Sequence, residues 1–198
     1  MKKELYIFRH GETDWNKENR TMGWSDVPLN DNGRAQAERL ASDLQKAGLE
    51  IIYSSPLSRT FETAEIVARP NNIKIVTNDA LKERNNGILE GHIARIEFPD
   101  IYDGMADPNF APPGGESTNQ LKNRVLDAMD NIIKTSEQNT IGISTSNAAA
   151  RVILEKFIDM ELPPFNLPNS AYFRLDWDGK TLKMNEVPKW LEVYMCRQ

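Results

Sequence analysis

The stretch LYIFRHGETDWN, from Leu5 to Asn16, contains His10, one of only two histidines in 198 residues. A short apolar run, Leu5 to Phe8, comes first and is followed by Arg9, His10 and a glycine. A short apolar run that gives way to polar residues and glycine predicts a buried strand followed by a loop. The histidine is therefore expected at the carboxyl end of a strand.

Working outward from this strand, the chain alternates predicted helices and strands. Helical spacing, capping residues and a helix-opening proline predict helices at 30–47, from Pro56 onward, after the capping box at 117–120, and at 148–158. Apolar runs predict strands at 49–55, 73–77 and 140–145, and a late strand pair joined at 178–179. The alternation predicts an α/β fold, a three-layer αβα sandwich with a mostly parallel central sheet, formed by one domain over residues 1–198.

The composition narrows the possible partners. A hydrophobic fraction of 39% and a charged fraction of 27% are typical of soluble globular proteins. A net charge of -5 argues against nucleic acid or an anionic membrane as partner. The single cysteine, Cys196, cannot form an internal disulfide or a zinc cage. Without a signal peptide or an apolar span, we expect a cytoplasmic protein.

Polar residues follow three of the predicted strands, at His10, at 54–55 and at 144–147. Ligands of open α/β sheets bind beyond the carboxyl ends of the strands, so these residues are expected to share one crevice. Arginines such as Arg9 and Arg59 suit phosphate oxygens, a neutral imidazole can attack phosphorus, and a carboxylic acid such as Glu83 can protonate a leaving oxygen. Such a set would transfer a phosphoryl group without a metal or a cofactor. Taken singly, each of these residues is more often structural or solvent-exposed.

Five segments in order change that balance, and with them the chain resembles the histidine phosphatase superfamily, the phosphoglycerate mutase-like family. The segments are FRHGETDWN, GWSDVPLNDNGRAQA, YSSPLSRTFETAEI, LKERNNGILEG and PPGGES. The resemblance covers nearly the whole chain and implies a phosphoglycerate mutase-like fold. It implies that His10 is the nucleophile that becomes phosphohistidine and that Glu83 is the general acid and later the base. The implied phosphate-binding residues are Arg9, Asn16 and Arg59, and the implied pocket residues are Gly11, Thr13, Gly23 and Arg84.

The chain departs from this family in TSNAAAR, residues 145–151. The family has a second catalytic histidine where this chain has Asn147, and glycines where it has alanines. An asparagine amide can donate a hydrogen bond to a phosphoryl oxygen, but it carries no charge. Slowed turnover is therefore expected at Asn147, unless another group such as His92 compensates. Three explanations stay open: an engineered change, which the altered neighbours argue against, a slow or specialised phosphatase, or a pseudophosphatase that binds phosphorylated ligands.

The segment 93–115 bears on the choice between hydrolase and mutase. Related mutases have a longer insertion there that helps to enclose the phosphorylated intermediate, so the short segment favours hydrolysis. The Glu83-Arg84 pair resembles the mutase form and keeps that alternative open. The expected partner is a phosphorylated small molecule, with no nucleic acid and no membrane, and the chain is either a monomer or a homodimer. The aromatic residues of the segment could contact the leaving group or pack the loop.

Overall fold

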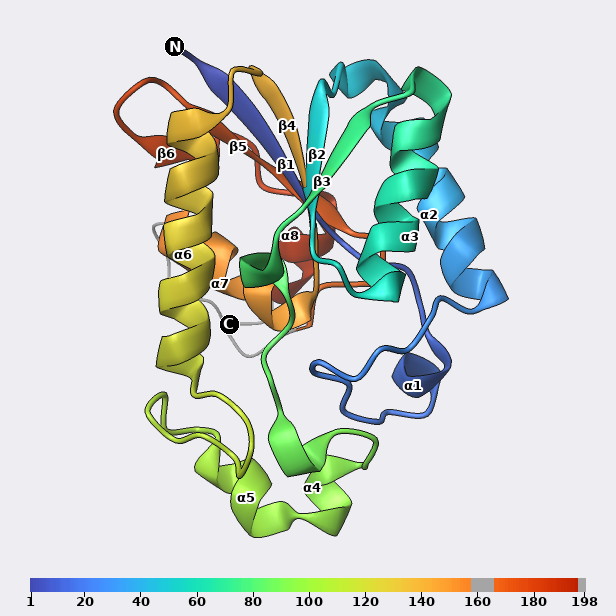
Figure 1. The fold of residues 1–198 in the computed structure, drawn as a ribbon, viewed down its shortest axis with the longest axis vertical. Coiled ribbons are helices and arrows are strands. Elements are labelled where there is room, and N and C mark those ends of the chain that lie inside the picture. Colours follow the sequence, from blue (N-terminus) through green and yellow to red (C-terminus); the bar gives the residue numbers. More distant parts are fainter. Residues whose placement is uncertain (158–165, 196–198) are drawn as a thin grey trace.

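In the computed structural model, which describes residues 1–157 and 166–195, a six-stranded sheet runs through the centre (Figure 1). The strands lie in the order β3-β2-β4-β1-β5-β6. Their bounds are β1 Lys3–Arg9, β2 Ile51–Ser54, β3 Lys74–Thr77, β4 Thr140–Thr145, β5 Tyr172–Trp177 and β6 Leu182–Lys183. Strands β1 to β4 pair in parallel, whereas β5 is antiparallel to both β1 and β6. The mostly parallel sheet and the late strand pair are confirmed.

Helices cover both faces of this sheet (Figure 1). One face packs against α2 Asp31–Leu44 and α3 Ser58–Ala68, and the other against α6 Thr118–Thr135, α7 Asn147–Phe157 and α8 Lys189–Met195. Strand β1 shows how the sequence separates the two cores. Leu5 and Ile7 belong to the cluster with α6 and α7, whereas Tyr6 and Phe8 belong to the cluster with α2 and α3. Side chains alternate across a strand, so one uninterrupted apolar run fills two cores and confirms the three-layer sandwich.

The carboxyl ends of β1, β2 and β4 meet at one edge of the sheet. Arg9 is the register partner of Thr145. The main-chain N–H of His10 donates to the oxygen of Thr145 at 3.1 Å, and that of Ser55 donates to the oxygen of Ser144 at 3.1 Å. The parallel ladder thus continues one residue past the strands, and the three polar strand ends lie together as expected.

Helix α3 begins at Ser58, not at Pro56 as the sequence predicts. The hydroxyl of Ser55 accepts the N–H of Leu57 at 3.3 Å, so the residues around Pro56 form the turn that leaves the strand. The carboxylate of Asp26 then accepts both the N–H and the hydroxyl of Ser58 at 2.7 Å, which fixes the start of the helix. The capping box that opens α6 is formed as predicted.

The observed bounds of β3 and α7 differ from the predicted bounds by one residue. Strand β3 begins at Lys74 rather than at Ile73, because the N–H of Ile73 donates to the oxygen of Ala68 at the end of α3. Helix α7 begins at Asn147, one residue before the prediction. Its predicted last residue, 158, lies outside the described residues, as does Cys196.

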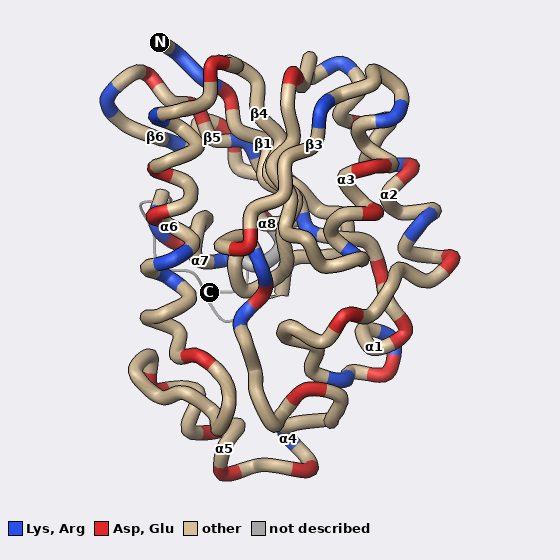
Figure 2. Tube along the Cα trace, in the orientation of Figure 1, with Lys and Arg blue, Asp and Glu red and all other residues tan. Residues whose placement is uncertain are grey.

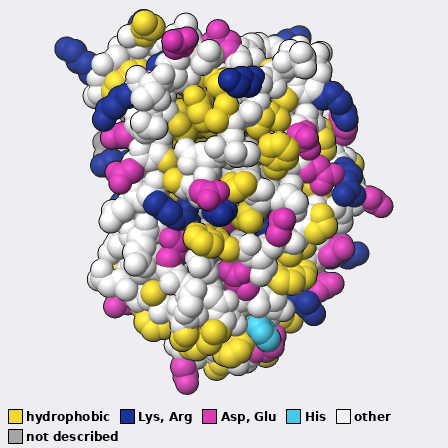
Figure 3. All heavy atoms as spheres, in the orientation of Figure 1, with side chains coloured by type: hydrophobic (Ala, Val, Ile, Leu, Met, Phe, Trp, Pro, Cys, Tyr) yellow, Lys and Arg dark blue, Asp and Glu magenta, His cyan; other side chains and the backbone are white. Residues whose placement is uncertain are grey.

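The segment 78–116, between β3 and α6, has short regular elements of its own. It contains the 3-10 turns η3 Asp79–Leu81 and η4 Gly87–Leu89. It also contains the short helices α4 Ala94–Glu97 and α5 Pro99–Gly104, and these two helices form one end of the molecule (Figure 1). Apolar side chains gather on the surface there (Figure 3). The exposed large apolar residues of this segment are Ile88, Ile93, Ile96 and Tyr102. The remaining short elements are α1 Asp14–Lys17, η1 Gln45–Ala47 and η2 Arg69–Asn71.

Charged residues of both signs are mixed along the chain (Figure 2). In the part of the chain that the structure describes, no helix has the length and the apolar character needed to cross a membrane.

Candidate active site

His10 lies immediately after β1, and only 1% of the residue is exposed. Its Nδ1 lies 2.7 Å from the main-chain oxygen of Gly11. A carbonyl oxygen only accepts hydrogen bonds, so Nδ1 carries the hydrogen and the neutral ring keeps its lone pair on Nε2. Burial lowers the pKa of His10 well below its ordinary value of 6.5, and the charges of Arg59 and Arg9 lower it further. The ring is therefore a neutral imidazole with Nε2 available as a nucleophile.

Two buried arginines accompany His10. In the first turn of α3, Arg59 donates from Nη1 to the oxygen of Ser25 at 2.9 Å and from Nη2 to that of Gly23 at 2.6 Å. Arg9 donates from Nη1 to the oxygen of Leu167. Among the described residues, the buried Nε atoms of both arginines have no hydrogen-bond partner. Unsatisfied buried donors on a cation are expected where a bound anion supplies the missing acceptor.

The charge of these arginines is only partly compensated. Burial lowers the pKa of Arg59 and lowers that of Arg9 to about 10, while the carboxylate of Glu83 opposes both changes. A guanidinium remains charged at neutral pH even after such a shift. The strand ends therefore present a positive site beside a neutral imidazole.

Glu83 lies in the loop between η3 and η4, where its carboxylate reaches the start of α7. It accepts the N–H of Ala148 at 3.1 and 3.2 Å and the N–H of Arg84 at 2.8 Å. The main-chain oxygen of Glu83 accepts from Nε1 of Trp24 at 2.8 Å and from Nη2 of Arg124 at 2.7 Å. Both the carboxylate and the backbone of Glu83 are thus held in place.

Asn147 is the first residue of α7, and its side chain is turned toward the segment 166–167. Its Oδ1 accepts the N–H of Leu167 at 2.8 Å, and its Nδ2 donates to Oδ1 of Asn166 at 2.8 Å. The oxygen of Leu167 is the acceptor for Arg9. Asn147 and Arg9 therefore bind the two polar groups of the same residue.

Asn16 and Thr13 form a capping box at the start of α1, and Thr13 is fully buried. Oδ1 of Asn16 accepts from the N–H and the hydroxyl of Thr13, each at 3.2 Å, and from Nδ2 of Asn169 at 3.2 Å. Nδ2 of Asn169 also lies 3.2 Å from the main-chain oxygen of His10. These bonds tie α1 to the end of β1.

Both glycines expected in the pocket, Gly11 and Gly23, lie so close to neighbouring atoms that a side chain would not fit. A Cβ at Gly11 would lie 2.3 Å from the oxygen of Gly33. Gly23 has a φ of +65°, and a Cβ there would lie 2.0 Å from Oε1 of Glu90.

Arg84 and His92, which the sequence also singled out, bind residues outside the set around His10. Arg84 is buried and donates to the oxygen of Glu116 at 3.0 Å, to Oγ1 of Thr118 at 3.1 Å and to the oxygen of Phe110 at 3.2 Å. It therefore anchors the segment 110–118. The side chain of His92 is half-exposed and pairs with Glu97, with Nδ1 and Oε2 2.6 Å apart.

Three further residues position this set and were not predicted from the sequence: Glu90, Arg124 and Asn169. Each acts through hydrogen bonds to distant backbone or loop atoms, which leave no periodic signal. Arg124 lies on α6 and donates to the main-chain oxygens of Ala80, Lys82 and Glu83. From the sequence alone, a single arginine on a helix is expected to lie on the solvent-exposed face.

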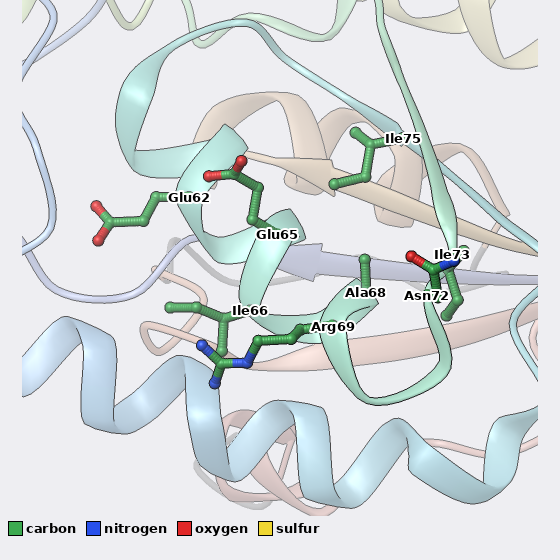
Figure 4. A pocket seen from close by; sticks show the side chains of 8 residues that line it. All are labelled: Glu62, Glu65, Ile66, Ala68, Arg69, Asn72, Ile73 and Ile75. Carbon is green, nitrogen blue, oxygen red and sulfur yellow. The ribbon is translucent and has the colours of Figure 1, made fainter.

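Two surface hollows lie away from this set. One of about 460 Å³ lies between α3 and β3 and is lined by Glu62, Ile66, Arg69 and Ile75 among others (Figure 4). One of about 560 Å³ lies at the opposite end of the sheet, beside Lys3, Asn139 and Arg174. Across the described residues, no group of three or more His, Cys, Asp or Glu side chains could hold a metal ion.

Comparison with known proteins gives consistent matches along the chain. The sequence model of the histidine phosphatase superfamily (branch 1) matches residues 5–188. A probable phosphoglycerate mutase GpmB of Proteus mirabilis is 36% identical over 188 residues, which are 89% of this chain and 86% of that protein. The structure of Bacillus stearothermophilus YhfR has a TM-score of 0.84 at 33% identity, over 92% of this chain and 95% of that chain. A mycobacterial glucosyl-3-phosphoglycerate phosphatase shares the fold, with a TM-score of 0.81 at 21% identity over 92% of this chain and 97% of that chain.

Proposed function

Because the chain belongs to the histidine phosphatase superfamily, we propose that it hydrolyses phosphomonoesters through a phosphohistidine formed on His10. The observation that carries the proposal is the state of that ring. Its Nδ1 is committed to the oxygen of Gly11, so Nε2 is free to attack, and two buried arginines flank it. A buried, neutral histidine between cations suits a nucleophile that approaches an anion.

The proposed reaction has two steps. In the first, Nε2 of His10 bonds to phosphorus, the bond from phosphorus to the ester oxygen breaks, and Glu83 gives its proton to that oxygen. In the second, Glu83 takes a proton from water, the water oxygen bonds to phosphorus, and the bond to Nε2 breaks. Arg9 and Arg59 bind the phosphoryl oxygens in both steps, and neither step requires a metal.

The other predicted site residues have supporting parts in this proposal. Asn16 is assigned to the phosphoryl group, and its link through Asn169 to the backbone of His10 supports a place beside it. Gly11, Thr13 and Gly23 shape the pocket. Arg84 shapes it from outside by anchoring the segment 110–118.

We assign Asn147 two tasks, to hold Leu167 and to offer a neutral donor to the phosphoryl group. The amide carries two hydrogens, and Asn166 takes one of them. A hydrogen bond from a charged group contributes about 1.5–3 kcal/mol, whereas a neutral one contributes about 0.5–1.5 kcal/mol. The expected loss relative to a histidine is thus about tenfold in rate, since 1.4 kcal/mol corresponds to a factor of ten.

Hydrolysis is favoured over mutase activity because the segment 93–115 is short and exposes apolar surface. The position of Arg84 supports the same choice, since its donors are taken by the segment 110–118. The substrate class we propose is a phosphorylated small molecule. A pseudophosphatase that binds without turnover is the second candidate, and the presence of Asn147 is the observation that favours it.

The test compares hydrolysis of p-nitrophenyl phosphate by the unchanged chain, His10→Gln and His92→Gln, from about pH 5 to pH 8. His92→Gln is the matched control, because the side chain of His92 is half-exposed and paired with Glu97, outside the proposed reacting groups. We expect His10→Gln to be inactive, His92→Gln to retain the rate, and an acid-labile phosphoprotein to be trapped only where His10 is present. Equal rates for both variants would disprove the proposed nucleophile.

Asn147→His separates the two candidates. An increase of about tenfold in the rate of an already active chain supports a slowed phosphatase. A chain that is inert until Asn147→His is introduced supports the pseudophosphatase.

A further inference from the structure

Glu90 does not belong to the proposed reacting groups, yet its carboxylate accepts four hydrogen bonds. Oε1 accepts the main-chain N–H of Trp24 at 2.8 Å and that of Asn86 at 3.0 Å. Oε2 accepts both the N–H and the hydroxyl of Ser25 at 2.6 Å. One half-buried side chain therefore joins the backbone of residues 23–25 to the loop that carries Glu83.

The other side of the same backbone holds Arg59. The oxygens of Gly23 and Ser25 accept from its two Nη atoms. The peptide between Gly23 and Trp24 thus has its oxygen on Arg59 and its N–H on Glu90. The N–H of Ser25 also donates to Glu90, and the oxygen of Ser25, which belongs to the next peptide, accepts from Arg59. Hydrogen bonds in such a chain polarise one another, so the negative charge of Glu90 strengthens the hydrogen bond from the guanidinium of Arg59 to the oxygen of Gly23.

The packing leaves this segment little freedom. Glu90 lies so close to Gly23 that any side chain at Gly23 would meet its carboxylate. Downstream, Asp26 is bonded to Ser58, the residue before Arg59. The segment is therefore held by α3 on one side and by Glu90 on the other. The negative charge of Glu90 also opposes the lowering of the Arg59 pKa by burial.

We propose that Glu90 is a positioning residue for phosphate binding, which orients the guanidinium of Arg59 through the backbone of residues 23–25. The affinity of the site for a phosphoryl group then depends on a carboxylate that never contacts it. This inference rests on the proposed function only in assigning Arg59 to phosphate.

The test measures the dissociation constant of inorganic phosphate by calorimetry, so it requires no turnover. Glu90→Gln keeps the shape but turns an amide toward main-chain N–H donors, and we expect phosphate to bind about tenfold more weakly. The matched control is Glu97→Gln. The Glu97 carboxylate also accepts a main-chain N–H, from Ile93 at 2.7 Å, and it pairs with His92 rather than with residues 23–25. We expect Glu97→Gln to bind phosphate as tightly as the unchanged chain does.

A double-mutant comparison tests whether Glu90 acts through Arg59. Added to Arg59→Lys, Glu90→Gln should weaken phosphate binding by less than about twofold further. If Glu90→Gln does not fold, Ser25→Ala removes one of the four bonds and should weaken phosphate binding by about threefold.

Unchanged phosphate affinity in Glu90→Gln, or an equal loss in both backgrounds, would overturn the inference. An unchanged chain that binds no phosphate would overturn both this inference and the proposed function. A chain that binds phosphate tightly, shows the expected losses and hydrolyses nothing would refute the hydrolase and leave the role of Glu90 standing.

Discussion

The buried, neutral state of His10 makes a prediction that does not depend on catalysis. In the unfolded chain the imidazole has its ordinary pKa of 6.5, whereas in the native protein burial and two arginines hold the pKa well below that value. Below pH 6.5 the unfolded chain therefore binds a proton that the native protein does not. Stability rises with pH wherever the unfolded state binds more protons, so His10 must make the protein less stable as the pH falls.

The magnitude follows from linkage. While native His10 stays neutral, each pH unit below 6.5 costs about 1.4 kcal/mol of unfolding free energy. Between pH 7.5 and pH 5.5 the contribution of this one residue is therefore about 1.4 kcal/mol. The contribution is fully present above the unfolded pKa and is lost on acidification toward the native one.

The assay is urea unfolding at both pH values in phosphate-free buffer, because a bound anion would stabilise the native state. The proteins are His92→Gln and the double variant His92→Gln with His10→Gln, so that His10 is the only histidine that differs. Carboxylates titrate equally in both, and the difference between their pH dependences belongs to His10. We expect the double variant to lose about 1.4 kcal/mol less on acidification. Parallel pH dependences would refute the assignment of a buried neutral imidazole.

Three further predictions concern Gly11, Glu83 and Asn147. Gly11→Ala places a methyl group 2.3 Å from a main-chain oxygen, so urea unfolding should show a loss of about 1–3 kcal/mol, and an unchanged unfolding free energy would contradict this close approach. Glu83→Gln removes the proton donor, so kcat should fall by about 10²–10⁴ in steady-state assays while phosphate still binds; an unchanged kcat would exclude the acid role. Asn147→Ala leaves the N–H of Leu167 without its acceptor, and denaturation should show a loss of about 1–3 kcal/mol that Asn147→Asp, which keeps the oxygen, largely avoids.

The layers of this fold could be predicted because the spacing of apolar residues along the chain determines which faces of the strands and helices are buried. The run from Leu5 to Phe8 supplies both cores, and the capping box of α6 forms from neighbouring residues. Boundaries set by distant partners were missed. The start of α3 depends on Asp26, which is 32 residues from Ser58 in the chain.

The same distinction applies to the site. Arg9 and His10 could be placed because they lie at the carboxyl end of a strand, and strand ends meet in a parallel sheet. Glu90 and Arg124 could not, because they bind main-chain atoms 41 to 66 residues away and these contacts depend on tertiary structure alone. The resemblance to the family predicts which residues react, whereas the structure shows which hydrogen bonds hold them.

The effect of Asn147 depends on both polar groups of its amide, the Nδ2 donor and the Oδ1 acceptor. As a donor it is weaker than a charged histidine, and that difference lies in the transition state. As an acceptor it holds the N–H of Leu167, whose oxygen holds Arg9, and that contact exists before any substrate binds. A histidine at 147 would strengthen the first interaction, but it has no carbonyl oxygen with which to make the second. The two effects separate in kinetics, since the donor acts on kcat and the position of Arg9 acts on phosphate affinity. We therefore expect a chain that carries asparagine here to turn over more slowly while it keeps a firmly held site for phosphate.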